Sequence, residues 1–104
     1  MLSDQLRKEI ENEVKTNKVL IYMKGTLSQP MCGFSARSAQ ILQSYGLPVK
    51  GHNILENEEL RQGIKEFTNW PTIPQIFING EFIGGCDIVT EMHDNGELEK
   101  LIKS

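Results

Sequence analysis

A continuous apolar run, Val19-Leu20-Ile21-Tyr22-Met23, restricts the fold more than any other feature of this sequence. Five residues are the length of a strand, and an unbroken apolar run is typical of a strand that is buried on both faces. The run therefore predicts a central strand of a sheet, and the other elements have to be placed around it.

A helix is predicted to precede this strand, over residues 3–17. Ser3 is a suitable N-cap, and Leu6, Ile10 and Val14 recur at every fourth position to give one apolar stripe. Most of the remaining positions are charged, so the helix is expected to pack on a surface with its other side in water.

The chain after residue 23 alternates between helical and strand patterns. Loop-forming residues fill 24–31, and Asn79-Gly80 between two strand-like runs is a strong hairpin signal. The predicted helices are 33–45, 58–68, 87–95 and 97–104, and the predicted strands are 49–54, 75–78 and 81–83. This order predicts an α/β fold, a four-stranded mixed sheet flanked by helices on both faces, in a single domain over 1–104.

Charge and apolar patterning exclude several classes of function. Eleven basic and fourteen acidic residues give a formal charge of −3, which argues against a nucleic-acid partner. No apolar run reaches the roughly 18–20 residues of a membrane span, and the N-terminal residues do not form a signal peptide. Two cysteines are too few for a disulfide scaffold, so Cys32 and Cys86 are interpreted as thiols in a reducing compartment.

Cys32 is the main candidate for chemistry. It follows a loop and begins a predicted helix, where the helix dipole and free backbone N–H groups favour the thiolate. Lys24, at the end of the preceding strand, would lower the thiol pKa further if the loop folds back. A thiolate serves equally as a nucleophile or as a metal ligand. The alternative is that Cys32 is a small buried apolar residue.

The residue three positions later is a serine. A dithiol oxidoreductase has a second cysteine there to resolve a mixed disulfide, whereas Ser35 can only donate a hydrogen bond to the thiolate. A redox cycle would therefore need another thiol, either Cys86 or a small thiol from solution.

With these features together, the sequence resembles the monothiol glutaredoxins, which have a thioredoxin-like fold. The resemblance covers essentially the whole chain and rests on motifs in the family's order: Lys24-Gly25, Cys32-Gly33-Phe34-Ser35, Trp70-Pro71-Thr72-Ile73-Pro74-Gln75, Gly80 and Gly84-Gly85-Cys86-Asp87. One departure is Leu27, where family loops often have proline, and it leaves the stiffness of the loop open.

The resemblance implies a glutathione site. It implies that Lys24 and Arg61 hold the glycine-end carboxylate, and that a cis Ile73-Pro74 step presents the backbone of Ile73 to the peptide. Without the resemblance, Arg61 would be interpreted as a solvated helix residue.

The second half of the implied site lies around the glycine pair. Gly84-Gly85 would allow close backbone approach and Asp87 would hold the ligand's amine, with Phe34 and Trp70 as walls. The plainer alternatives are a simple turn, an N-cap for Asp87 and a core position for Trp70. Cys86 is a candidate site residue that is either an auxiliary thiol or without function.

Two functions from different classes follow from the resemblance. In the first, Cys32 and the thiol of bound glutathione ligate a [2Fe-2S] cluster shared by two subunits, and the protein carries the cluster to apo iron–sulfur client proteins. In the second, Cys32 is the nucleophile of a glutathione-dependent oxidoreductase that removes glutathione from proteins. A third possibility is a regulatory module that pairs with a BolA-like protein. The expected location is the cytoplasm if the source is bacterial, or the mitochondrial matrix or a plastid if it is eukaryotic.

The two histidines carry little signal. His52 and His93 have no ligand spacing to each other, so they are interpreted as a strand or loop surface residue and a helix surface residue.

Overall fold

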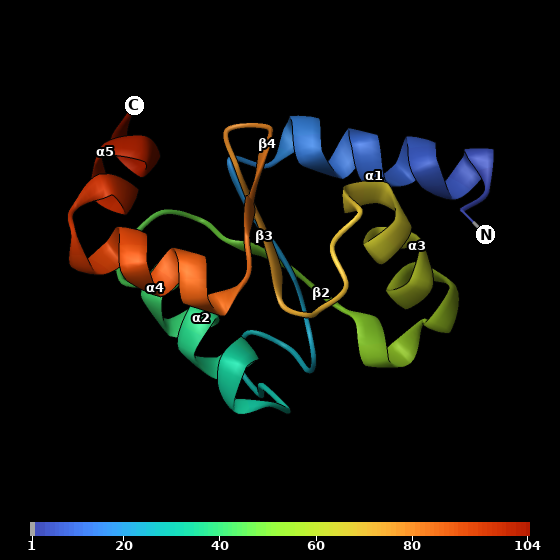
Figure 1. Cartoon of the computed structure of the whole chain (residues 1–104), viewed down its shortest axis with the longest axis horizontal. Coiled ribbons are helices and arrows are strands. Elements are labelled where there is room, and N and C mark those ends of the chain that lie inside the picture. Colours follow the sequence, from blue (N-terminus) through green and yellow to red (C-terminus); the bar gives the residue numbers. More distant parts are fainter. Residues whose placement is uncertain (1) are drawn as a thin grey trace.

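The computed structural model describes residues 2–104. Five α-helices, one short 3-10 helix and four strands follow one another along these described residues (Figure 1). In order they are α1 (Asp4–Thr16), β1 (Val19–Met23), α2 (Gly33–Gln43), β2 (Lys50–Asn53), η1 (Ile54–Glu56), α3 (Glu58–Thr68), β3 (Gln75–Ile78), β4 (Glu81–Gly84), α4 (Cys86–Asp94) and α5 (Glu97–Lys103).

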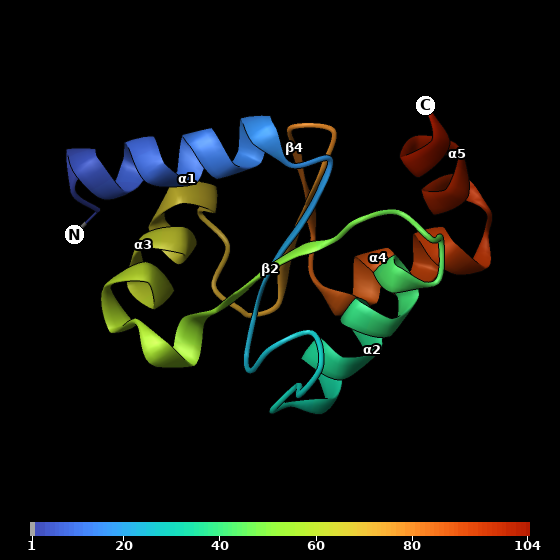
Figure 2. The ribbon, with the colours of Figure 1, turned by 180° about the vertical axis from the view of Figure 1, so that it is seen from behind.

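The four strands form one mixed sheet in the order β2-β1-β3-β4. β1 pairs parallel to β2 and antiparallel to β3, and all five of its residues are buried, which confirms the predicted central strand. Figure 1 and Figure 2 show α1 and α3 on one side of the sheet and α2, α4 and α5 on the other. A separate apolar cluster fills each space between sheet and helices, so the predicted α/β architecture is confirmed.

The register at the carboxyl end of β1 brings distant parts of the chain together. Tyr22 lies opposite Gln75, and Met23 lies opposite Asn53. The end of β1, the end of β2 and the start of β3 therefore share one edge of the sheet. The loops that follow or precede these residues have to lie side by side there.

Several boundaries differ by one or two residues from the sequence prediction, and the local structure at three of them is informative. α2 ends at Gln43 rather than at residue 45, and Gly46 then adopts a positive φ of 77°. β2 ends at Asn53, whose side chain accepts the N–H of Leu55 and starts η1. The N-cap of α4 is Gly85, so the alternative that Asp87 is an N-cap is wrong, and Asp87 lies inside the first turn.

The predicted hairpin is confirmed in detail. Asn79 and Gly80 both have positive φ, 53° and 81°, which is the backbone of a two-residue turn between β3 and β4. Asn tolerates this conformation and Gly adopts it freely, so this dipeptide fixes the register of the edge strand β4.

In residues 2–104 no helix combines the length and the apolar character needed to cross a membrane.

The packing of α3 against the sheet predicts an uneven response to truncation of side chains. Ile64 is fully buried in the cluster beneath α1 and α3, whereas Leu55 on η1 is 46% exposed. Ile64→Ala is expected to lower the free energy of unfolding by about 2–5 kcal/mol, because it leaves a cavity. Leu55→Ala is expected to cost less than about 1 kcal/mol. Urea unfolding of both variants measures this, and equal losses would contradict the assignment of the core.

Candidate functional site

A groove of about 430 Å³ opens at the carboxyl end of β1. Its walls come from the start of α2, from α3, from the segment before β3 and from the start of α4. It is lined by Lys24, Phe34, Arg61, Lys65, Trp70, Pro71, Thr72, Ile73, Pro74, Gly85, Cys86, Asp87 and Ile88. All six residues predicted to bind a ligand, Lys24, Phe34, Arg61, Ile73, Cys86 and Asp87, therefore lie in one groove.

Cys32 is not among the residues that line this groove. It is the N-cap of α2, two residues before the exposed Phe34, which does line the groove. The side chain of Cys32 is partly exposed, so the alternative of a buried apolar residue is wrong. The pKa of Cys32 is lowered, chiefly by the backbone N–H of Ser35, with smaller contributions from the N–H of Phe34, the Ser35 hydroxyl and Lys24. Partial burial opposes this. Free amides at a helix start thus stabilise the thiolate more than the lysine does.

The loop before Cys32 is held by its own backbone. The N–H of Met31 donates to the carbonyl of Lys24 at 2.9 Å, and Thr26 and Gln29 exchange two backbone hydrogen bonds. Leu27, the departure from the family pattern, is partly buried against the apolar cluster of α2. Hydrogen bonds and this contact hold the loop at a position where the family often has proline.

The opposite wall is fixed by a buried glutamine. The Ile73-Pro74 peptide bond is cis, as predicted. Gln75, fully buried, donates from Nε2 to the carbonyls of Trp70 and Thr72 at 3.0 and 3.1 Å, and its Oε1 accepts the hydroxyl of Thr68 at 2.8 Å. These three bonds tie the loop between α3 and β3 to the sheet, and no sequence pattern predicted them.

The glycine pair allows the chain to approach that wall closely. Gly84 has a φ of +142°, and a Cβ at this position would lie 2.7 Å from the Ile88 side chain. A Cβ on Gly85 would lie 3.2 Å from the carbonyl oxygen of Pro74. Both glycines therefore have a packing reason, and the alternative of a simple turn does not account for the contact at Gly85. Close approach of this backbone to a ligand stays a prediction.

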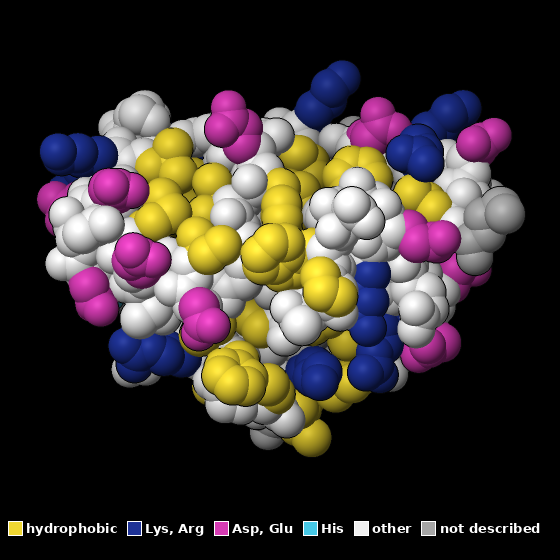
Figure 3. All heavy atoms as spheres, in the orientation of Figure 1, with side chains coloured by type: hydrophobic (Ala, Val, Ile, Leu, Met, Phe, Trp, Pro, Cys, Tyr) yellow, Lys and Arg dark blue, Asp and Glu magenta, His cyan; other side chains and the backbone are white. Residues whose placement is uncertain are grey.

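The groove has an excess of positive charge. Lys24, Arg61 and Lys65 line it, against one carboxylate, Asp87. In Figure 3, basic side chains lie beside hydrophobic ones in the lower part of the face shown. Lys65 was missed from the sequence, although its position four residues after Arg61 on the same helix places it on the same face.

Trp70 and Cys86 each combine a packing role with a place in the groove. Trp70 stands edge-on to Phe82, with ring centroids 5.7 Å apart, so it is both wall and packing residue. Cys86 is 8% exposed, and its sulfur lies 3.8 Å from the hydroxyl of Thr90.

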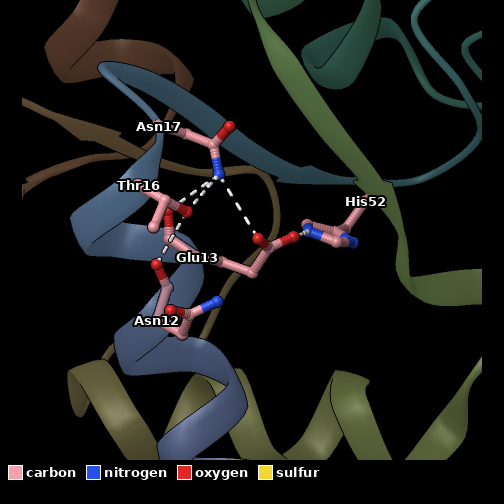
Figure 4. Close-up of polar contacts among 5 residues, drawn as sticks. All are labelled: Asn12, Glu13, Thr16, Asn17 and His52. Carbon is pink, nitrogen blue, oxygen red and sulfur yellow. Dashed lines mark hydrogen bonds and ion pairs between the residues drawn. The ribbon is translucent and has the colours of Figure 1, made fainter.

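His52 is more than a surface residue of β2. Its Nε2 lies 2.6 Å from Oε1 of Glu13 (Figure 4), and each of these side chains is 27% exposed. The ring also stacks on Tyr22. It therefore joins β2 to α1, outside the groove. His93 is exposed on α4 as predicted, with Nδ1 2.6 Å from the hydroxyl of Tyr45. Within residues 2–104, no three His, Cys, Asp or Glu side chains are grouped so that they could hold a metal ion.

Comparison with known proteins identifies relatives for nearly all of this chain. A model of the glutaredoxin family matches residues 19–83. The mitochondrial monothiol glutaredoxin-S15 of Arabidopsis thaliana is 52% identical over 101 residues, which are 97% of this chain and 60% of that relative. The chain thus spans less than two thirds of the length of that protein.

Solved structures show the same architecture. Reduced poplar apo GrxS14 aligns with a TM-score of 0.83 at 49% identity, covering 94% of this chain and 90% of that one. A complex of buckwheat glutaredoxin with glutathione aligns with a TM-score of 0.82 at 23% identity, covering 93% and 86%, and bears on the fold alone. The predicted thioredoxin-like fold is confirmed.

The environment of Cys32 predicts the pH dependence of its alkylation. In a Cys86→Ser background, the rate of reaction with iodoacetamide reports the Cys32 thiolate. Because the folded protein lowers the pKa of this thiol, the folded-state rate should remain high at pH values where the same chain in denaturant has lost most of its reactivity. Identical midpoints for the folded and denatured chains would contradict the stabilising role of the α2 amides.

Proposed function

The chain belongs to the glutaredoxin family and resembles its monothiol members, and we propose that it binds glutathione and carries a [2Fe-2S] cluster to client proteins. The observation that carries this proposal is one partly exposed, stabilised thiolate beside a groove lined by three cations and one carboxylate. A ligand with two carboxylates, one amine and a thiol matches that set of charges.

The groove suggests how each group of glutathione is held. Arg61 offers a planar, two-pronged grip for the glycine-end carboxylate, and Lys24 and Lys65 add charge around it. The amides at the start of α4 suit the second carboxylate, and Asp87 suits the amine. The backbone of Ile73 is available to pair with the peptide like a strand.

In this proposal the [2Fe-2S] cluster is the cargo of the protein, and the number of thiolates that it needs fits two chains. A [2Fe-2S] cluster needs four thiolates. One chain offers Cys32, and no side-chain group in residues 2–104 would hold the metal by itself. Cys32 and one bound glutathione from each of two subunits complete the set. Because half of these ligands are held without covalent bonds, the cluster is suited to transfer.

Partners and location follow from the same proposal. A cluster-bound homodimer, a BolA-like protein that uses the cluster site and apo iron–sulfur client proteins are the proposed partners. The proposed compartment is the cytoplasm if bacterial, or the mitochondrial matrix or a plastid if eukaryotic. The Arabidopsis relative is named as mitochondrial.

The alternative is a deglutathionylating enzyme, which the lowered pKa of Cys32 also favours. The Cys32 thiolate would attack the glutathione sulfur of a protein mixed disulfide, and the protein would leave as a thiolate. A second glutathione thiolate would then attack the Cys32-bound glutathione, releasing oxidised glutathione and restoring the Cys32 thiolate. Ser35 supplies no resolving thiol, so each turnover consumes glutathione from solution.

Binding of glutathione should depend on the cationic wall. Arg61→Ala is expected to weaken the affinity for reduced glutathione about tenfold, since a charge-assisted hydrogen bond is worth roughly 1.5 kcal/mol or more. Arg7→Ala, on the exposed side of α1, is the matched control and should bind as the unmodified protein does. Isothermal calorimetry measures both, and equal affinities would contradict the site.

Cluster binding should require both Cys32 and glutathione. Anaerobic reconstitution with iron, sulfide and glutathione is expected to give a brown dimer by visible absorption and size-exclusion chromatography. Cys32→Ser should stay colourless, and Cys86→Ser should retain the colour. Colour that forms without glutathione would make Cys86 a ligand and overturn the shared-ligand arrangement. A colourless monomer that turns over a glutathione mixed disulfide would support the enzyme instead.

A further inference from the structure

The turn at Lys24-Gly25 is held from outside its own loop. The backbone N–H of Lys24 donates to the Ser35 hydroxyl of α2 at 3.0 Å, and the N–H of Gly25 donates to Oδ1 of Asn53 at 2.9 Å. Two successive amides are thus held by side chains from two different elements. Side chains that accept backbone amides fix the path of a loop.

Asn53 is the more unusual of these acceptors. It is the last residue of the edge strand β2 and is 28 residues from Gly25 along the chain. The same oxygen also accepts the N–H of Leu55 at 3.0 Å, which starts η1. One side chain therefore ends the edge strand and fastens the loop that leads to Cys32.

A second contact between β2 and this loop lies at Gly51. A Cβ on Gly51 would lie 3.0 Å from Cγ of Leu27, so the glycine leaves room for that loop side chain. Figure 2 shows β2, the edge strand, in front of the other strands of the sheet, with the loop that leads to α2 close to its end. The edge strand thus holds the loop at one apolar and one polar point.

The turn itself leaves little freedom once Gly25 is fixed. Gly25 is buried with a φ of +91°, and a Cβ there would lie 2.5 Å from the backbone of Gln29 and of Met31. The loop is wrapped tightly around this residue. A shift of Gly25 would move Lys24 in the groove on one side and Met31, next to Cys32, on the other.

We propose that Asn53 is a positioning residue for the groove. Its side chain holds the Lys24-Gly25 turn so that Lys24 faces the ligand. This role rests on the proposed glutathione site, and Asn53 acts through Lys24 without touching the ligand. The sequence pattern does not predict this role for Asn53, because its partner Gly25 is 28 residues away along the chain.

The test compares four variants of the full chain. Asn53→Ala removes both bonds, and Asn53→Ser keeps a short acceptor suited to Leu55 that reaches less far toward Gly25. Asn53→Asp keeps the acceptor oxygen. Asn95→Ala is the matched control, since Oδ1 of Asn95 also accepts the N–H two residues ahead, Glu97, at 2.9 Å, but at the start of α5. Exchange of the Gly25 amide is followed by NMR, and affinity for reduced glutathione by calorimetry.

Asn53→Ala and Asn53→Ser are expected to speed exchange of the Gly25 amide at least about tenfold and to weaken glutathione binding about fivefold, the loss of one net hydrogen bond. Asn53→Asp and Asn95→Ala should stay within about twofold of the unmodified protein in both measurements. If Asn53→Ala does not fold, Asn53→Ser decides.

Two results would overturn the proposal. Unchanged Gly25 exchange in the Ala and Ser variants would show that Asn53 does not hold the turn. Faster exchange with unchanged affinity would reduce its role to local structure. Failure of the unmodified protein to bind glutathione would instead refute the proposed function, and the exchange measurement would still decide whether Asn53 holds the turn.

Discussion

The pairing of β1 at its carboxyl end is the constraint on which the groove depends. Because β1 runs parallel to β2 and antiparallel to β3, Met23 meets Asn53 and Tyr22 meets Gln75 at one edge of the sheet. Each partner's side chain then fixes a loop: Asn53 holds the turn at Gly25, and Gln75 holds the segment from Trp70 to Thr72. The register of β1 with its two neighbouring strands thereby sets the distance between the two walls.

Thiolate stabilisation and ligand recognition are divided between different groups. The amides at the start of α2 do most to lower the pKa of Cys32, and Lys24 contributes least among the groups that lower it. Lys24 is therefore available to a ligand carboxylate, together with Arg61 and Lys65. Backbone amides lower the pKa of this thiol without using a side chain that the ligand would engage, which suits either a cluster ligand or a nucleophile.

Most of the architecture could be predicted from local patterns, and the links between loops could not. The apolar run of β1, the Asn79-Gly80 turn and the start of α2 at Cys32 each carry their own signal in neighbouring residues. The role of Asn53 depends on the pairing of β1 with β2, which no local pattern encodes. The partners of Gln75 lie three to seven residues before it, but only the folded path of that segment turns them toward its buried side chain. Lys65 could have been predicted from its spacing of four residues from Arg61. The His52–Glu13 contact could not, because it joins residues 39 positions apart.

The most direct test of the central claim is an NMR titration of the reduced protein with reduced glutathione. Binding in the groove predicts that the largest amide shifts occur at Lys24, Arg61, Ile73 and Asp87, the residues that line both walls. The amide of Glu13 on α1, whose side chain contacts His52 of β2 outside the groove, should not shift. Shifts that are absent, or that gather away from the carboxyl end of β1, would contradict the account.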